Sequence, residues 1–470
     1  MKPRYMLAAL TTILVLGCKV GPNYRRPLIH PPDVFRGGGD ETQPADVTSL
    51  ADLKWFEVFK DERLQELIRT TLRQNYDLRD AVARVDAARA NLGITRADQF
   101  PSINVTADIT NLRLSTNGAF QLPFGFDQKR TFGSVLLNLL SFEVDAWGQL
   151  RRATESDRAN LLLAEENRKT VVTTLVSDVA AAYFSLLELD MELEIARHTL
   201  ATREDSRRLI EVRQRGGVAT LLDLRQAEQL VYGAAQTIPD VERLIEQTEN
   251  QIQLLLGLSP GAVVRGLPLT EQPQLPSVPP GLPSSLLERR PDILAAEQNL
   301  IAANAIIGVA KAAYFPQITL TGYLGSETDQ LSNLFTGPAR AWQFVPQILQ
   351  PIFEGGRIRS TVKLREAQRE IALVQYEKTI ETAFREVSDA LVQHRRVKEI
   401  RTQQELLVAA LQDRSRLAYM RYRGGVDTLL NALDADRDLF TAELALAQTR
   451  RDELQAMVQL YKALGGGWQQ

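Results

Sequence analysis

Two nearly identical stretches decide the fold of this chain: RGGVATLL at residues 215–222 and RGGVDTLL at residues 423–430. They differ at one position and lie 208 positions apart. Paired glycines can reach the positive φ that lets a chain reverse between antiparallel helices. Each stretch therefore predicts a tight turn that presents one valine, and the duplication predicts that the chain contains one unit twice.

Other segments repeat in the same order. RADQFPSINVTADI from Arg96 corresponds to KAAYFPQITLTGYL from Lys311, 215 positions later. This self-similarity indicates two copies of a unit of about 210 residues. We expect repeat 1 at residues 63–257, repeat 2 at residues 286–463, and a short tail at 464–470. The prolines between the repeats exclude a helix and predict an extended linker at 258–285.

Each unit should contain two strands and a long helical hairpin. Apolar and polar residues alternate from Ile103 to Ile109, as in a sheet with one apolar and one polar face. Strands are expected at about 102–114 and 131–144, and at about 317–326 and 341–353, where Pro346 and Pro351 weaken the last strand. From Val172 to Leu200 apolar residues recur every three or four positions, which predicts long supercoiling helices.

Four strands cannot enclose a channel, because about eight make the smallest filled barrel. A bilayer does not tolerate the unpaired edges of an open sheet. The chain is therefore expected to oligomerise. Three copies would supply about twelve strands around an aqueous bore, and a dimer would also close.

The N-terminus predicts a targeting segment. Lys2 and Arg4 precede a short apolar core that ends beside Cys18, the only cysteine. This pattern predicts a signal peptide at residues 1–17 and lipid attachment at Cys18, followed by a lipid-anchored extended segment at 18–62. No later apolar run reaches about 20 residues, so we expect no membrane-spanning helix.

Composition argues against several functions. The 55 basic and 58 acidic side chains are interspersed and give a net charge of −3, whereas a nucleic-acid partner would require a basic face. His30, His198 and His394 are far apart, and no metal-binding or phosphate-binding motif occurs. We therefore expect no metal, no cofactor and no enzymatic activity, since no nucleophile–base constellation is present.

Several motifs together resemble the outer membrane factor family: CKVGPNYRRP from Cys18, LLERRPDILAAE from Leu286, the paired Phe-Pro segments and the two GGV turns. The similarity is greatest to the TolC-like lipoprotein channels of resistance-nodulation-division efflux pumps. It implies an α+β membrane protein, a trimeric 12-stranded β-barrel with four strands per chain, continued by a long periplasmic α-helical coiled-coil barrel. It also implies an outer-membrane exit channel for small molecules in a Gram-negative bacterium. Its partners would be a periplasmic adaptor and an inner-membrane pump.

The resemblance also assigns the two turns. They would form the periplasmic tip that binds the adaptor, through Gly216, Gly217, Val218, Gly424, Gly425 and Val426.

A periplasmic gate would lie just after the second turn. Leu430 and Asp434 match the positions that narrow the bore, and their four-residue spacing places them on one helix face. Asn431 stands where related channels often carry a second aspartate. Asp223 and Tyr422 match positions that contact neighbouring helices in the closed state.

Two alternatives to an efflux channel stay open. A channel for type I protein secretion would share the same architecture. A non-conducting lipoprotein scaffold would explain the heptads and the anchor, but not the two-faced strands. The pump, rather than this conduit, would choose the substrate.

Overall fold

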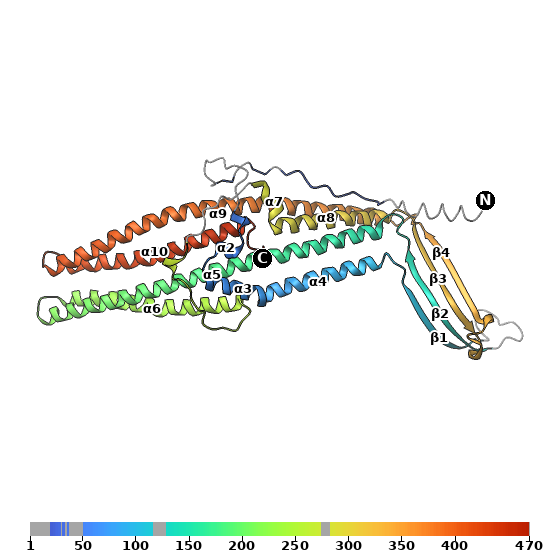
Figure 1. The fold of residues 1–470 in the computed structure, drawn as a ribbon, viewed down its shortest axis with the longest axis horizontal. Helices are drawn as coiled ribbons and strands as arrows, with labels where there is room; N and C mark the ends of the chain where they lie inside the picture. Colours follow the sequence, from blue (N-terminus) through green and yellow to red (C-terminus); the bar gives the residue numbers. More distant parts are fainter. Residues whose placement is uncertain are drawn as a thin grey trace. The chain divides into compact units, whose positions relative to one another are not determined.

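The computed structural model describes residues 19–29, 31–32, 35–36, 50–115, 128–273 and 283–469 (Figure 1). The chain divides into two compact units. Unit 1 comprises Met1–Pro27, Val85–Leu163 and Ala296–Tyr376. Unit 2 comprises Leu28–Arg84, Ala164–Ala295 and Glu377–Gln470. Cys18 lies outside the described residues.

The long elements come in two matched sets. Repeat 1 contains α4 (Tyr76–Ala97), β1 (Ile103–Arg113), β2 (Lys129–Glu143), α5 (Gln149–Arg215) and α6 (Leu221–Leu255). Repeat 2 contains α8 (Pro291–Ala312), β3 (Gln317–Thr328), β4 (Arg340–Leu349), α9 (Arg357–Arg423) and α10 (Leu429–Ala463). Corresponding helices have equal lengths of 22, 67 and 35 residues. The internal duplication is therefore present in the fold.

Short elements precede and connect the repeats. They are η1 (Leu50–Asp52), α2 (Trp55–Val58), α3 (Glu62–Gln74), η2 (Leu269–Glu271), η3 (Pro283–Ser285) and α7 (Leu286–Arg289). Two further 3₁₀ turns, η4 (Leu331–Asn333) and η5 (Gly337–Ala339), lie between β3 and β4.

Unit 1 contains one antiparallel sheet in the order β1-β2-β3-β4 (Figure 1). One cross-strand row runs through Val105, Leu137, Leu324 and Trp342. These four side chains are 68%, 46%, 61% and 75% exposed. A neighbouring row on the other face, Asn104, Asn138, Tyr323 and Gln343, is polar, and the Ser134 hydroxyl on that face donates to Asp108 at 2.6 Å. The sheet thus has the expected apolar and polar faces, and the apolar face is uncovered within one chain.

Strand ends differ from the sequence-based bounds. The strand expected at 341–353 spans Arg340–Leu349, because Pro351 has no N–H to extend the ladder. Pro346 stays within β4, opposite Leu320, and β4 is an edge strand, where a proline is tolerated. The other three strands end within two residues of the expected positions.

The helical hairpins α5–α6 and α9–α10 are each antiparallel, and unit 2 contains them from Ala164 of α5 and from Glu377 of α9 onward (Figure 1). The heptad positions of α5 that belong to this unit are mostly buried, including Val172, Leu175, Val179, Ala182, Leu186, Leu189 and Ala196. Several of them pack on α6 residues Val241, Ile245 and Ile252. The three-four spacing is therefore a packing seam.

One expectation about the membrane needs correction. By length and apolarity alone, α5 and α8 could each cross a bilayer. Their apolar windows are 67% and 56% buried inside the protein, however, as core helices also are. Hydropathy therefore does not separate a spanning helix from a packed one here.

Candidate functional site

The first helical turn is a Schellman motif that ends α5. The N–H of Val218 donates to the Arg213 carbonyl at 2.8 Å, and the N–H of Gly217 donates to the Gln214 carbonyl at 3.0 Å. Gly217 has φ +73°, whereas Gly216 does not have a positive φ. The left-handed conformation therefore requires glycine only at the second position of the pair.

The second turn repeats this geometry at the end of α9. Val426 donates to the Arg421 carbonyl at 3.1 Å, Gly425 donates to the Tyr422 carbonyl at 3.0 Å, and Gly425 has φ +74°. Val218 and Val426 are 71% and 66% exposed. Both turns thus present an apolar side chain to the surroundings of the chain.

The helices that follow the turns are capped differently. In α6, Thr220 and Asp223 form a reciprocal capping box, with N–H to side-chain oxygen distances of 2.8 and 3.1 Å. In α10, Asn431 occupies the same position and donates through its amide to Asp427 at 2.7 Å. This bond and the neighbouring Arg421 hold the pKa of Asp427 below its usual value. Asp223 thus uses its hydrogen bonds to cap the N-terminus of its own helix, α6.

Leu430 and Asp434 lie on an exposed stripe of α10. Leu430 is 50% exposed, whereas Leu429 and Leu433 are buried. The Asp434 carboxylate pairs with Arg437 at 3.2 Å and its side chain is 38% exposed. The two predicted gate residues thus share a face that is turned away from the core of the hairpins.

Tyr422 is part of that core. It packs with Leu429, Ile210 and Ala227, which come from α10, α5 and α6. The guanidinium of Arg213 lies 4.7 Å from the centre of its ring. Tyr422 therefore joins the two hairpins within one chain.

Sequence reasoning missed a buried ion pair between the hairpins. Arg203 on α5 contacts Asp436 on α10 at 2.7 Å, with side chains 4% and 10% exposed. Arg203 also donates to the Leu230 carbonyl at 3.0 Å and lies 4.8 Å from the ring centre of Phe440. Burial and the charge of Asp436 raise the pKa of Tyr419. Among so many charged residues, no local pattern distinguishes this pair from a solvated face.

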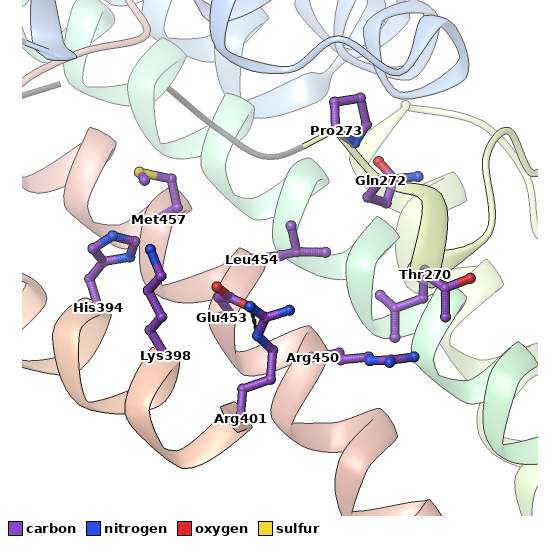
Figure 2. Close-up of a pocket in the computed structure, with 11 residues that line it drawn as sticks. Thr270, Gln272, Pro273, His394, Lys398, Arg401, Arg450, Glu453, Leu454 and Met457 are labelled. Carbon is purple, nitrogen blue, oxygen red and sulfur yellow. Dashed lines mark ion pairs between the residues drawn. The ribbon is translucent and has the colours of Figure 1, made fainter. Parts of the chain in front are cut away.

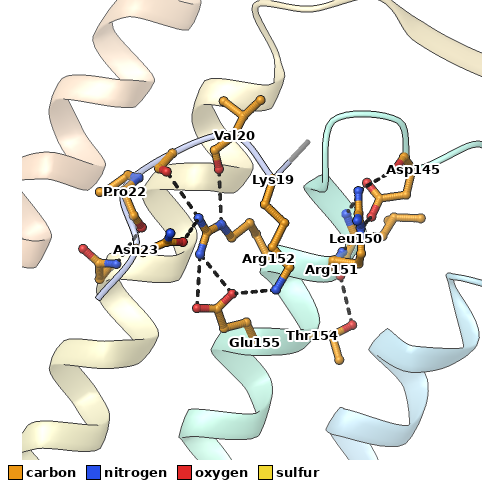
Figure 3. Close-up of polar contacts among 12 residues, drawn as sticks. Lys19, Val20, Pro22, Asn23, Asp145, Leu150, Arg151, Arg152, Thr154 and Glu155 are labelled. Carbon is orange, nitrogen blue, oxygen red and sulfur yellow. Dashed lines mark hydrogen bonds and ion pairs between the residues drawn. The ribbon is translucent and has the colours of Figure 1, made fainter. Parts of the chain in front are cut away.

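The segment that follows Cys18 is bound by the start of α5 in unit 1 (Figure 3). Arg152 is 1% exposed, and its guanidinium donates to the carbonyls of Val20 and Gly21, both at 3.2 Å, and to the Asn23 side chain at 2.8 Å. The N–H of Val20 donates to the Trp147 carbonyl at 3.0 Å. Residues 19–23 are therefore fixed beside the end of β2.

Repeat 2 binds the other side of this segment through α8. Asn304 donates to the Pro22 carbonyl at 3.0 Å. Tyr24 and Arg26 donate to Glu297 at 2.9 and 2.7 Å. A Cβ at Gly308 would lie 2.7 Å from the Val20 carbonyl oxygen, so close approach requires glycine there. The N-terminal segment thus bridges the two repeats inside unit 1.

Nothing in the described ranges resembles a metal centre: no three His, Cys, Asp or Glu side chains are grouped to hold an ion.

Comparison with known proteins decides the family. The chain matches the family described as outer membrane efflux protein over residues 67–258 and 282–466. It belongs to that family. The efflux pump outer membrane protein TtgC of Pseudomonas putida is 39% identical over 463 residues, covering 98% of this chain and 95% of TtgC. The outer membrane protein OprJ of Pseudomonas aeruginosa is 36% identical over 473 residues, covering 99% and 97%.

Solved structures of related outer-membrane channels have the same fold as this outer membrane efflux protein. The channel OprN superposes with a TM-score of 0.88 at 30% identity, covering 96% of this chain and all of OprN. The Neisseria gonorrhoeae MtrE channel in its open state gives 0.86 at 30% identity, covering 96% and 99%. The expected fold class is confirmed, with four strands per chain continued by long helices as in the trimeric outer-membrane channels. The expected outer-membrane location in Gram-negative bacteria is confirmed at the level of the family.

Proposed function

We propose that three copies of this outer membrane efflux protein form the exit channel of a tripartite efflux pump. The observation that carries the proposal is the sheet of unit 1. Within the described residues, β1 and β4 each lack a strand on one side, and an apolar row lies uncovered across all four strands. Pairing β4 of one copy with β1 of the next would remove every edge and turn one apolar face to lipid.

The channel would accept small molecules from a periplasmic adaptor and an inner-membrane pump of the resistance-nodulation-division type. The names of relatives support this class of cargo, since close relatives from Pseudomonas putida are called toluene and antibiotic efflux proteins. The pump would select the cargo, and the conduit would carry it to the exterior.

The assembly is tested with purified protein in detergent. Sedimentation should give three times the mass of one chain after correction for detergent and signal peptide, and the same trimers should form conducting pores in planar bilayers. A stable monomer with full strand content would overturn the barrel. A trimer that never conducts would favour the scaffold function instead.

We further propose that Leu430 and Asp434 form the periplasmic gate, with Asn431 beside them. Their shared exposed face supports this, because three copies around one axis would stack an apolar and an acidic ring. Leu430→Ser with Asp434→Ala should raise single-channel conductance. The matched control is Leu222→Ser with Gln226→Ala, the same positions in repeat 1. If both double variants conduct like the parent, the constriction lies elsewhere, with Tyr422 and Asp223 as next candidates.

The two turns are proposed as the adaptor-binding tip. Val218 and Val426 are exposed and their glycines leave the backbone accessible. Val426→Asp would place a charge in a desolvated contact at a cost of about 1–3 kcal/mol. It should weaken crosslinking to the adaptor without changing trimer mass. If Val218→Asp and Val426→Asp both crosslink to the adaptor like the parent, the turns serve only to cap helices.

Cys18 is proposed as the lipid-bearing residue. The fixed segment 19–26 supports this, because it would hold an anchored N-terminus beside the strands. Cys18→Ser should abolish incorporation of radiolabelled palmitate. Arg152→Ala keeps the cysteine but removes the contacts to residues 20–23, and it should keep the label. Label on Cys18→Ser would refute the assignment.

A further inference from the structure

The two helical hairpins have the same backbone elements, but the charged side chains at the cleft between their helices differ. In repeat 1, the segment after α6 contacts α5 and α6, and together with Asp190 it lines a cavity of about 270 Å³. Arg265 from this segment binds Asp190 on α5 through two hydrogen bonds of 2.9 and 3.1 Å. Arg265 also contacts Glu249 on α6, whose carboxylate accepts the N–H of Val263 at 3.0 Å. An acidic cleft is thus satisfied by a cation from the chain itself.

In repeat 2 the charges at the same positions differ, because one is reversed and the other is absent. A shift of 208 residues places Lys398 at the position of Asp190 and Met457 at that of Glu249. An ion pair between the helices is also inverted. Arg197 on α5 pairs with Glu242 on α6 at 2.7 Å, and at the corresponding positions Glu405 on α9 pairs with Arg450 on α10 at 3.4 Å.

The repeat 2 cleft is open, with a cavity of about 240 Å³ (Figure 2). Its walls are α9, α10 and the stretch around η2. The charged side chains that line it are Lys398, Arg401, Arg450 and Glu453. In Figure 2, Arg450 extends towards Thr270, Arg401 lies beside Glu453, and Lys398 lies beside His394. Cations therefore outnumber carboxylates on the wall by three to one.

The nearby carboxylates do not neutralise this excess. Glu453 pairs with Arg401 at 2.9 Å, and Glu405 is shared between Arg450 at 3.4 Å and Arg401 at 3.6 Å. No ion pair or hydrogen bond engages the Lys398 ammonium within the described part of the chain. The buried Nδ1 of His394 also lacks a partner there. Lys398 is exposed and so accessible to a ligand, whereas the His394 nitrogen is buried without a hydrogen-bond complement.

Among the described residues, Glu453 is the one carboxylate on the wall of this cavity, whereas Asp190 and Glu249 of repeat 1 share the cation of Arg265. We infer that the cleft between α9 and α10 binds a small oxyanion from solution, a tetrahedral oxyanion or a carboxylate, between Lys398, Arg401 and Arg450. Arginine forks and a lysine ammonium are the groups that bind such oxygens with charge-assisted hydrogen bonds. This site is separate from the conducting function and does not depend on it.

Isothermal titration of the detergent-solubilised trimer tests the site, with sulfate as the tetrahedral probe and citrate as the carboxylate probe. At least one probe should bind saturably with one site per chain. Lys398→Gln should weaken that binding about tenfold, because one charge-assisted contact is lost. The matched control is Arg396→Gln, which removes an exposed positive charge from the same helix and should leave the affinity unchanged.

The pH dependence gives a second readout. Burial, together with Lys398, holds the pKa of His394 below its usual value, and Glu453 opposes this effect. Arg401 and Arg450 also line the cavity, together with the neutral Thr270 and Gln272. A bound anion would favour protonated His394, so the affinity for sulfate should rise as the pH falls from 7.5 to 5.5. His394→Gln should flatten this dependence.

Three results would overturn the site. They are the absence of saturable binding with both probes, equal binding by Lys398→Gln and the parent, and an equal loss in Arg396→Gln. Arg450→Gln serves as a second variant if Lys398→Gln does not assemble. Conductance of Lys398→Gln trimers in planar bilayers should match the parent, so failure of the anion site and failure of the channel are distinguishable.

Discussion

The two hairpins show how a duplicated fold can keep its backbone and exchange its electrostatics. Both have helices of 67 and 35 residues joined by the same Schellman turn. Both Asp190 and its counterpart Lys398 line cavities, yet Asp190 is bound by Arg265, whereas Lys398 has no ion pair within the described residues. The apolar seam and the glycine fix the geometry, because packing and positive φ tolerate few substitutions. Charges at the cleft are free to diverge as long as each buried group finds a partner.

The largest expected effect concerns the buried pair between the hairpins. Arg203→Ala leaves Asp436 buried and unpaired, which should cost about 3–5 kcal/mol. The corresponding residues of the other hairpin are Leu411 and Glu228, and Glu228 pairs only with Arg225 on its own helix. Glu228→Ala should therefore change stability by less than about 0.5 kcal/mol. Chemical unfolding followed by circular dichroism measures the stability of both variants. Equal losses of stability in Arg203→Ala and Glu228→Ala would contradict the predicted difference between the hairpins.

The next largest loss of stability is expected from a substitution in the cleft of repeat 1. Arg265→Ala leaves Glu249 and Asp190 without their cation, at an expected cost of about 2–3 kcal/mol, reduced because the arginine is partly exposed. Lys398→Ala, at the mirrored cleft, should be neutral in buffer without oxyanions. Chemical unfolding followed by circular dichroism measures the stability of both variants. A loss on Lys398→Ala that matches Arg265→Ala would mean that the second cleft already has an internal partner.

The two glycines of each turn should differ in stability. Gly425→Ala puts a side chain at φ +74°, which should cost about 1–2 kcal/mol. Gly424→Ala does not meet this strain. The difference should recur at Gly217 and Gly216, and thermal unfolding of the four variants measures it. Equal effects within one pair would contradict the Schellman geometry.

The smallest expected effect is a pH dependence that only one hairpin has. Burial and the neighbouring Glu192 raise the pKa of Glu188 on α5 to about 8. Its counterpart in α9 is the exposed Arg396. Because the folded pKa lies above the unfolded value, folded protein retains the proton longer, and this stabilisation is lost as the pH rises from about 4.5 to about 8.

Glu188→Gln should flatten this slope but raise the unfolding temperature at pH 8 by only roughly 1–2 °C, because the substitution also removes the ion pair with Arg451. Arg396→Gln is the control and should leave the slope unchanged. An unaltered slope in Glu188→Gln would mean that Arg451, 3.2 Å from the Glu188 carboxylate, keeps it ionised.

Much of the candidate site was predictable because its signals are local. The duplication, the turns, the strand pairs and the exposed valines follow from glycine, proline and the periodicity of apolar residues. The stripe of Leu430 and Asp434 follows from helical spacing. Strand ends were less predictable: β4 ends at Leu349, four residues before the expected position, because Pro351 has no N–H to extend the ladder.

The sequence by itself determined the repeated helix–strand–hairpin unit, the need for more strands than one chain supplies, and the family resemblance. These depend on interactions between residues near one another in the chain. Only the tertiary structure showed that Arg203 meets Asp436, that Arg152 holds residues 20–23, and that Arg265 binds Asp190. Such pairs join residues more than 70 positions apart. In a chain with 24% charged residues, each charge has many possible partners, and only packing selects the one it meets.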